Sequence, residues 1–326
     1  MRKFAHLRGH RPARKQRGFF SLPEVLISLA VITAISFVVI GSVGPWLGLK
    51  QNLDNDRKML DLRNALTSLY DTQAMAAEVQ PSGTFFGFQT SAIDGQGNCN
   101  VQAAPFVQLK TLINDSGTEA AHDGFGNPWC IFVSPQMSAV RDGATIYYRN
   151  IGVVSPGRDG TLDPSSRMAA NGTLNLGGDD VGFVVSGYDI QAAKLKDTMD
   201  RLNRIATTYE GYFTTRFLSY ADRDITRDYF STAYDSGGSI MSSGGVWANV
   251  ATLNSIGVSP SDAVTPWETS NTIQMGNNTE SVNGIQVRSP ATSGTGVLPY
   301  TALFRAQLPA PAGVTNYVTR VAVGNY

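Results

Sequence analysis

The chain has 326 residues, of which 42% are hydrophobic and 16% are charged. This length accommodates about two domains, and this apolar content excludes disorder by composition. The 26 basic and 26 acidic side chains balance, but seven basic residues and no acidic one lie within residues 1–18. The remaining 19 basic and 26 acidic residues give a formal charge of −7, which argues against nucleic acid as a partner.

The first predicted element is an apolar helix. Residues Val25 to Leu49 include no charged side chain, and as a helix they reach about 37 Å, more than a bilayer core requires. We expect a kink or a locally melted turn between Gly41 and Gly48, where glycines and Pro45 cluster. The basic leader predicts that the N-terminus stays cytoplasmic and that the chain beyond Lys50 crosses the membrane.

The residues before this helix carry a resemblance to a known family. Basic residues precede Gly18 and Phe19, and a lone carboxylate, Glu24, stands at the mouth of the apolar run. This order resembles the type III signal of prepilins and pseudopilins. The resemblance implies that a prepilin peptidase cuts after Gly18, that Phe19 is then methylated, and that Glu24 meets the α-amine of a neighbouring subunit.

One alternative concerns the cleavage site. The family places the carboxylate fifth in the mature chain, and cleavage after Gly18 makes Glu24 the sixth residue. Cleavage after Phe19 restores the spacing but loses the glycine, the one residue that a tight peptidase site can select for its lack of a side chain. A second interpretation of Glu24 is a carboxylate that snorkels to the headgroups.

The helical pattern continues in amphipathic form beyond Lys50 and stops before Pro81. One face carries Met59, Leu62, Leu66, Leu69 and Ala76. A short helix around Phe106 to Ile113 and strands at Cys130–Val133 and Ala144–Val154 are then expected. The intervening run Asp123–Trp129 is similar to the "Asp-Pro-Trp-Gly-Asn-Pro-Tyr" turn of type II secretion pseudopilins, which implies an antiparallel sheet packed on the helix.

The two cysteines, Cys99 and Cys130, both lie on the translocated side. A disulfide is the simplest prediction there, and closing a loop of about thirty residues contributes roughly 3 kcal/mol. Two buried free thiols are the alternative. His6 and His10 lie in the leader, so the processed chain keeps only His122. Zinc clusters and histidine triads are nearly excluded, and we expect no enzyme.

An acidic loop is expected between Ser155 and Val181. The runs Ser155–Gly160 and Gly177–Val181 resemble the calcium loop of major pseudopilins. The resemblance implies calcium ligands at Asp159, Asp179 and Asp180, with Asp163 as an additional candidate, since calcium takes oxygen ligands. The alternative is a solvated turn in which Asp and Gly serve backbone needs.

A second module is predicted from residue 186 onward. Ser186 to Asp189 is a candidate capping box before a second long helical pattern, and Trp247 to Ile256 predicts another short helix. Pro266-Trp267 then repeats Pro128-Trp129, which indicates a tandem of pilin-like modules. Chance similarity, or a C-terminal module of another kind with a β-rich end, is the alternative.

These patterns together predict an α+β fold: a long N-terminal helix, transmembrane and then amphipathic, packed on an antiparallel sheet and followed by a second helix-plus-sheet module. The expected domains are a leader at 1–18, a transmembrane half-helix at 19–49 and modules at 50–185 and 186–326. The resemblance implies a minor, priming or tip subunit of a type IV pilus or pseudopilus. Its partners would be prepilin peptidase, other pilin subunits and the inner-membrane assembly platform. A membrane-anchored periplasmic binding or adhesive protein that does not polymerise is the alternative.

Overall fold

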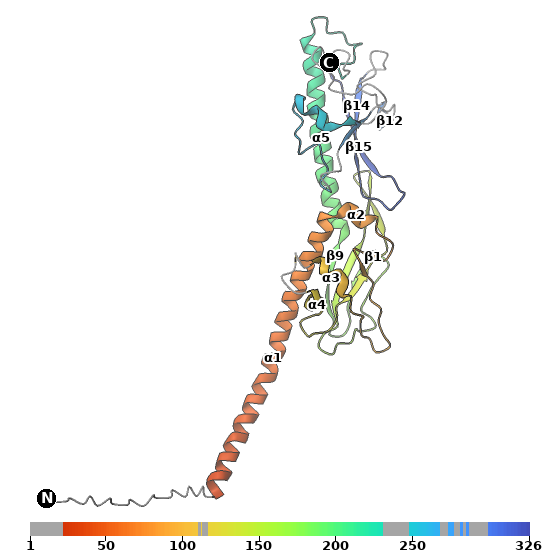
Figure 1. The fold of residues 1–326 in the computed structure, drawn as a ribbon. Helices are drawn as coiled ribbons and strands as arrows, with labels where there is room; N and C mark the ends of the chain where they lie inside the picture. The colour runs from red at the N-terminus through yellow and green to blue at the C-terminus, as the bar shows by residue number, and fades with distance from the viewer. Residues whose placement is uncertain are drawn as a thin grey trace, which may run out of the picture. The chain divides into compact units, whose positions relative to one another are not determined.

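The computed structural model describes residues 22–109, 112, 117–230, 248–267, 273–276, 281–282, 285–286 and 299–326, and it leaves side chains undescribed at 22, 24, 37–45, 248–249, 251–253, 275–276, 281–282 and 285–286. Within this part the predicted α+β class is confirmed (Figure 1). The chain divides into two compact units, residues 1–53 and 54–326, which are described separately below.

The first unit consists, in its described part, of helix α1 (Leu22–Thr72) up to Leu53. Pro23 lies in the first turn, where its missing N–H has no helical partner to lose. Residues 41–48 are helical, so the predicted locally melted turn is wrong. A single proline removes one N–H from the ladder, and the helix continues on both sides of it.

The second unit begins with the last five turns of α1, which bury one face. Leu62, Leu66 and Leu69 pack against a three-stranded antiparallel sheet of order β3-β6-β9. These strands are β3 (Cys130–Val133), β6 (Asn150–Ser155) and β9 (Val181–Ser186). Full burial of one such leucine contributes about 1.5 to 3 kcal/mol, so this face fixes the helix on the sheet.

Shorter elements surround this sheet. They are α2 (Ala74–Glu78), β1 (Thr84–Phe85), β2 (Phe88–Gln89), α3 (Ala103–Leu109), α4 (Gly117–Ala120), β4 (Met137–Arg141), β5 (Ala144–Tyr148), β7 (Arg167–Met168) and β8 (Leu174–Asn175). Leu162, Met168 and Leu174 cover the sheet face that carries Phe132 and Val154. The sheet is therefore buried on both faces.

The second helix-plus-sheet assembly starts directly after β9. Helix α5 (Gly187–Ser219) begins at Ser186, whose hydroxyl accepts from Asp189 N, the bond expected from the predicted capping box. It packs on a four-stranded antiparallel sheet of order β10-β11-β14-β15 (Figure 1). The remaining elements are β10 (Ala248–Asn249), the 3-10 helix η2 (Val250–Ile256), β11 (Gln274–Gly276), β12 (Ser281–Val282), β13 (Ile285–Gln286), β14 (Thr301–Gln307) and β15 (Tyr317–Val323).

The two assemblies share one topology. In each, the first strand after the Pro-Trp dipeptide pairs with one side of the middle strand, and the last strand pairs with its other side. A two-stranded hairpin lies between the first and the middle strand in the sequence. Strands β3, β6 and β9 thus correspond to β11, β14 and β15. The short helix before Pro-Trp is α3 in the first assembly and η2 in the second.

The long helices also correspond side chain by side chain. Asp54 pairs with Lys58, which donates to the Asp123 carbonyl, and Asp197 pairs with Arg201, which donates to the Ser261 and Val264 carbonyls. Each cation thus holds the loop that precedes Pro-Trp. Asp54 and Asp197, like Lys58 and Arg201, are 143 residues apart. We therefore name residues 54–186 and 187–326 the first and second repeat.

Candidate functional site

The N-terminal candidates lie at the edge of the described chain. Gly18 and Phe19, the predicted processing residues, are outside the described residues. Glu24 belongs to the first turn of α1, and its side chain is also outside them. The cleavage position and the role of Glu24 stay predictions.

The described part of α1 after Glu24 exposes apolar side chains in every direction. Consecutive residues of a helix point about 100° apart, and between 50% and 64% of each large side chain is accessible at Val25, Leu26, Ile27, Leu29, Val31, Ile32 and Ile35. An apolar surface of this kind marks a contact with protein or lipid. Among the described residues, no helix has both the length and the hydropathy needed to cross a membrane.

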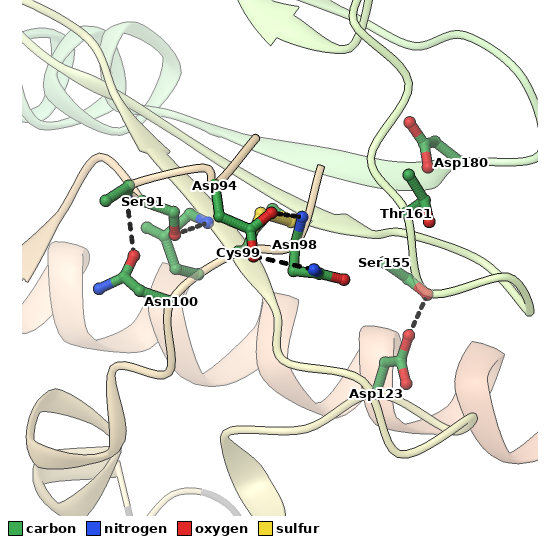
Figure 2. The surroundings of a disulfide bond; sticks show 12 residues. Ser91, Asp94, Asn98, Cys99, Asn100, Asp123, Ser155, Thr161 and Asp180 are labelled. Carbon is green, nitrogen blue, oxygen red and sulfur yellow. Dashed lines mark hydrogen bonds between the residues drawn. A yellow bond between two sulfur atoms is a disulfide. The ribbon is translucent and has the colours of Figure 1, made fainter. Parts of the chain in front are cut away.

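The predicted disulfide is confirmed and lies within the first repeat (Figure 2). It joins Cys130, the first residue of β3, to Cys99, with 5.4 Å between the two Cα atoms. Asp94 holds the loop before Cys99, because its carboxylate accepts from both the backbone and the side chain of Asn98 (Figure 2). It also accepts from the backbone N–H of Gln96. The disulfide therefore attaches an already ordered loop to the sheet.

In the predicted acidic loop, the charges of Asp179 and Asp163 act on the pKa of Asp180. Asp180 is buried, and burial raises its pKa, with further contributions from the charges of Asp179 and Asp163. Its Oδ2 accepts from Asp163 N at 2.9 Å, while its buried Oδ1 has no hydrogen-bond partner. That oxygen is a ligand atom of the type that calcium binds.

The other carboxylates of this loop serve local turns. Asp159 accepts from Thr161 N, and Asp163 accepts from the backbone and hydroxyl of Ser165. No group of three or more His, Cys, Asp or Glu side chains in the described part of the chain is arranged to hold a metal ion. The loop thus supplies one oxygen that fits calcium, and calcium at Asp159, Asp179 and Asp180 stays a prediction.

The Asp123–Trp129 turn has a structural explanation. The buried Asp123 carboxylate accepts from the backbone N–H of Phe125 and Asn127 and from the Ser155 hydroxyl (Figure 2). A side chain at Gly124 would lie 2.2 Å from the backbone nitrogen of Asn55, so glycine is required where the turn meets α1. Trp129 is buried and donates to the Ala120 carbonyl.

Sequence reasoning missed a buried polar cluster at the end of α1. Arg149, 2% exposed, donates to the carbonyls of Gln80, Pro81 and Thr84 and lies 3.9 Å from the Glu78 carboxylate. Tyr70 donates its hydroxyl to Glu78. Burial raises the pKa of Glu78, and the hydrogen bonds from Tyr70 and Gln136 and the Arg149 charge partly oppose that rise. Nothing local in the sequence marks these residues, because they lie up to 79 positions apart.

Comparisons with known proteins found no match. No protein-family model matches the chain, no curated protein matches its sequence, and no solved structure matches its fold.

Proposed function

We propose that the chain is a structural subunit of a type IV pilus or a secretion pseudopilus, processed by prepilin peptidase and assembled through its N-terminal helix. The apolar surface of α1 from Val25 to Ile35 carries this proposal. Burying surface of this kind contributes about 25 cal/mol per Å², and a helix that is apolar on all sides is stable only in lipid or among other helices.

The sequence order adds support. A basic leader, Gly18 and Glu24 come before the exposed helix, and an ordered, disulfide-bonded repeat follows it. In this proposal the helix first anchors the subunit in the inner membrane with its bulk in the periplasm. The assembly platform then extracts the subunit into a polymer, in which Glu24 pairs with the α-amine of a neighbour. An ionised carboxylate among apolar groups costs about 2.5 to 3.5 kcal/mol on insertion scales, so it selects a subunit that supplies the positive charge.

The size of the second repeat favours a minor, priming or tip subunit, because a repeated shaft has to accommodate every added domain. Calcium at the loop of Asp159, Asp179 and Asp180 is a secondary part of the proposal, supported by the unpartnered oxygen of Asp180.

Mass spectrometry of the mature N-terminus tests the proposal. The full chain is produced in a cell that contains a prepilin peptidase and a filament assembly system. We expect a methylated phenylalanine at residue 19, or at residue 20 if cleavage follows Phe19. A mature chain that starts at Met1 would instead support the unpolymerised, membrane-anchored protein.

A matched pair of variants tests the assembly step. Glu24→Gln removes the charge without changing side-chain size, and we expect it to be processed normally but recovered poorly in sheared filaments. The control is Glu119→Gln, since Glu119 is an exposed carboxylate of α4. Equal recovery of both variants in filaments would contradict the role of Glu24.

A further inference from the structure

The junction between the two repeats is built around one buried amide. Gln191, in the second turn of α5, donates from Nε2 to the Ala74 carbonyl of α2 at 3.0 Å. Its Oε1 accepts from Trp267 Nε1 of the second repeat at 2.6 Å. Gln191 is 1% exposed and Trp267 is 3% exposed. Gln191 belongs to the second repeat, so its bond to Ala74 crosses the junction, while the bond from Trp267 fixes the amide within its own repeat. Both bonds are shielded from water.

Two further links lie beside this amide. Lys194 pairs with Asp71 of α1 at 3.0 Å and donates to the Pro266 carbonyl at 2.8 Å. Asn316, just before β15, donates to the Thr145 carbonyl of β5 at 2.8 Å. Side chains fill the space between these links and leave a cavity of about 10 Å³. Residues of both repeats line it, among them Ile146, Leu195 and Leu308. That volume holds at most one water molecule.

The polar cluster of Tyr70, Glu78 and Arg149 lies directly beneath this junction. Burial raises the pKa of Tyr70 and of Glu78, and the nearby Gln191 amide opposes that rise. The backbone of Arg149 accepts at its carbonyl from Gly187 N, the first residue of α5, at 3.1 Å. The start of α5 is thus bonded to the same groups that close the end of α1.

The second repeat has aromatic side chains at the corresponding positions. Its Tyr300 carbonyl accepts from Gly324 N, as that of Arg149 accepts from Gly187 N. A side chain at Gly187 would strike Tyr70, and one at Gly324 would strike Phe213. Tyr300 and Phe213 therefore stand where the first repeat has Arg149 and Tyr70. The first repeat's place thus contains the buried ion pair of Arg149 and Glu78, whereas the second repeat's place contains aromatic side chains and the buried carboxylate of Asp228.

We propose that Gln191, together with the Tyr70–Glu78–Arg149 cluster beneath it, is a positioning device that holds the second repeat in one orientation on the first. Apolar burial is non-directional and permits several arrangements of similar energy, whereas buried hydrogen-bonded groups penalise every orientation that leaves them unpaired. Residues 54–326 then move as one body. This is expected whether or not the chain assembles into a filament.

Spin-label distance measurements test the proposal on the full chain in detergent. Labels are attached at Thr67→Cys on α1 and Thr207→Cys on α5, both exposed helical positions within residues 54–326. We expect a single narrow distance distribution. Gln191→Leu keeps the side-chain volume but removes both bonds, and it should broaden the distribution or add a second peak.

Trp129→Phe is the matched control. Trp129 is the first repeat's counterpart of Trp267, and its indole N–H donates to the Ala120 carbonyl within the first repeat, outside the proposed device. It should lower the unfolding midpoint and leave the distribution narrow, which separates loss of orientation from loss of stability. If Gln191→Leu does not fold, Trp267→Phe removes the N–H that donates to Gln191 Oε1, leaves the amide unfixed within its own repeat, and should broaden the distribution. A broad distribution in the parent, or a narrow one in the folded junction variant, would overturn the proposal.

Discussion

Removal of the disulfide is expected to cost the protein about 4 to 6 kcal/mol. The perturbation is the double substitution Cys99→Ala/Cys130→Ala. The two cysteines are 31 positions apart, and in the chain-entropy model a cross-link over such a loop contributes about 3.7 kcal/mol by restricting the unfolded chain. Cys130 is fully buried and Cys99 nearly so, so the deleted sulfur atoms add about 0.5 to 1 kcal/mol each.

The folded loop should survive the substitution. Asp94 keeps its three hydrogen bonds to the Gln96–Asn98 segment, and Asn100 and Ala92 exchange two more. Most of the expected loss therefore arises in the unfolded state. A more expanded unfolded chain exposes more surface, so the urea dependence of the unfolding free energy should become steeper.

The assay is urea unfolding of the full chain in detergent, followed by tryptophan fluorescence, to which the buried Trp129, next to Cys130, and the buried Trp267 contribute. Each single alanine variant breaks the same cross-link and should match the double variant within about 1 kcal/mol. A loss below about 2 kcal/mol, with an unchanged urea dependence, would refute the attribution to the unfolded chain.

Three further outcomes are expected. Gly187→Ala places a Cβ 2.1 Å from the Arg149 carbonyl oxygen and should lower the unfolding free energy by more than about 2 kcal/mol. Gly211→Ala meets open space on the same helix and should raise it by about 0.5 to 1 kcal/mol. Urea midpoints compare the two variants, and equal effects would contradict the packing at Gly187. Burial raises the folded-state pKa of Glu78, so the folded protein holds this proton more tightly, and stability should fall as pH rises from the unfolded value near 4.5 through the folded value. Glu78→Gln should flatten that decline in a pH series of unfolding free energies, and a parallel decline would count against the assignment. Calcium should raise the melting temperature of the parent and leave Asp180→Asn unchanged; a parent melting temperature that chelator does not move would remove the calcium proposal.

The elements that were predictable are those with a local cause. The spacing of Leu62, Leu66 and Leu69 indicated the buried face of α1, and Ser186 with Asp189 located the start of α5 within one residue. The disulfide was predicted from the expected compartment and from the presence of two cysteines, without knowledge of the distance between them. Each of these predictions depends on residues a few positions apart or on chemistry that any fold in that compartment would share.

The buried cluster of Tyr70, Glu78 and Arg149 was not predictable, because its residues lie far apart in the sequence. Arg149 lay inside what was expected to be one strand from Ala144 to Val154, and the structure splits that run into β5 and β6 at this residue. Its partners follow α1 about 70 positions earlier. A charged residue in a strand-like run indicates a solvated face by default. Only the folded structure shows that this side chain turns inward between the two strands and donates to the carbonyls of Gln80, Pro81 and Thr84.

The two repeats explain why such a costly cluster persists. Replacing a buried ionic group by well-packed apolar residues is often neutral or stabilising. At the equivalent place in the second repeat there is aromatic packing, since Phe213 packs on Tyr229, Phe230 and Tyr326. The equivalent place in the second repeat therefore closes with aromatic packing and one buried carboxylate, Asp228, where the first repeat has the Arg149–Glu78 ion pair. In the first repeat this end is also bonded to α5, through Gln191 at the Ala74 carbonyl and Gly187 at the Arg149 carbonyl. The charged cluster is thus better explained by the orientation it imposes than by the stability it adds.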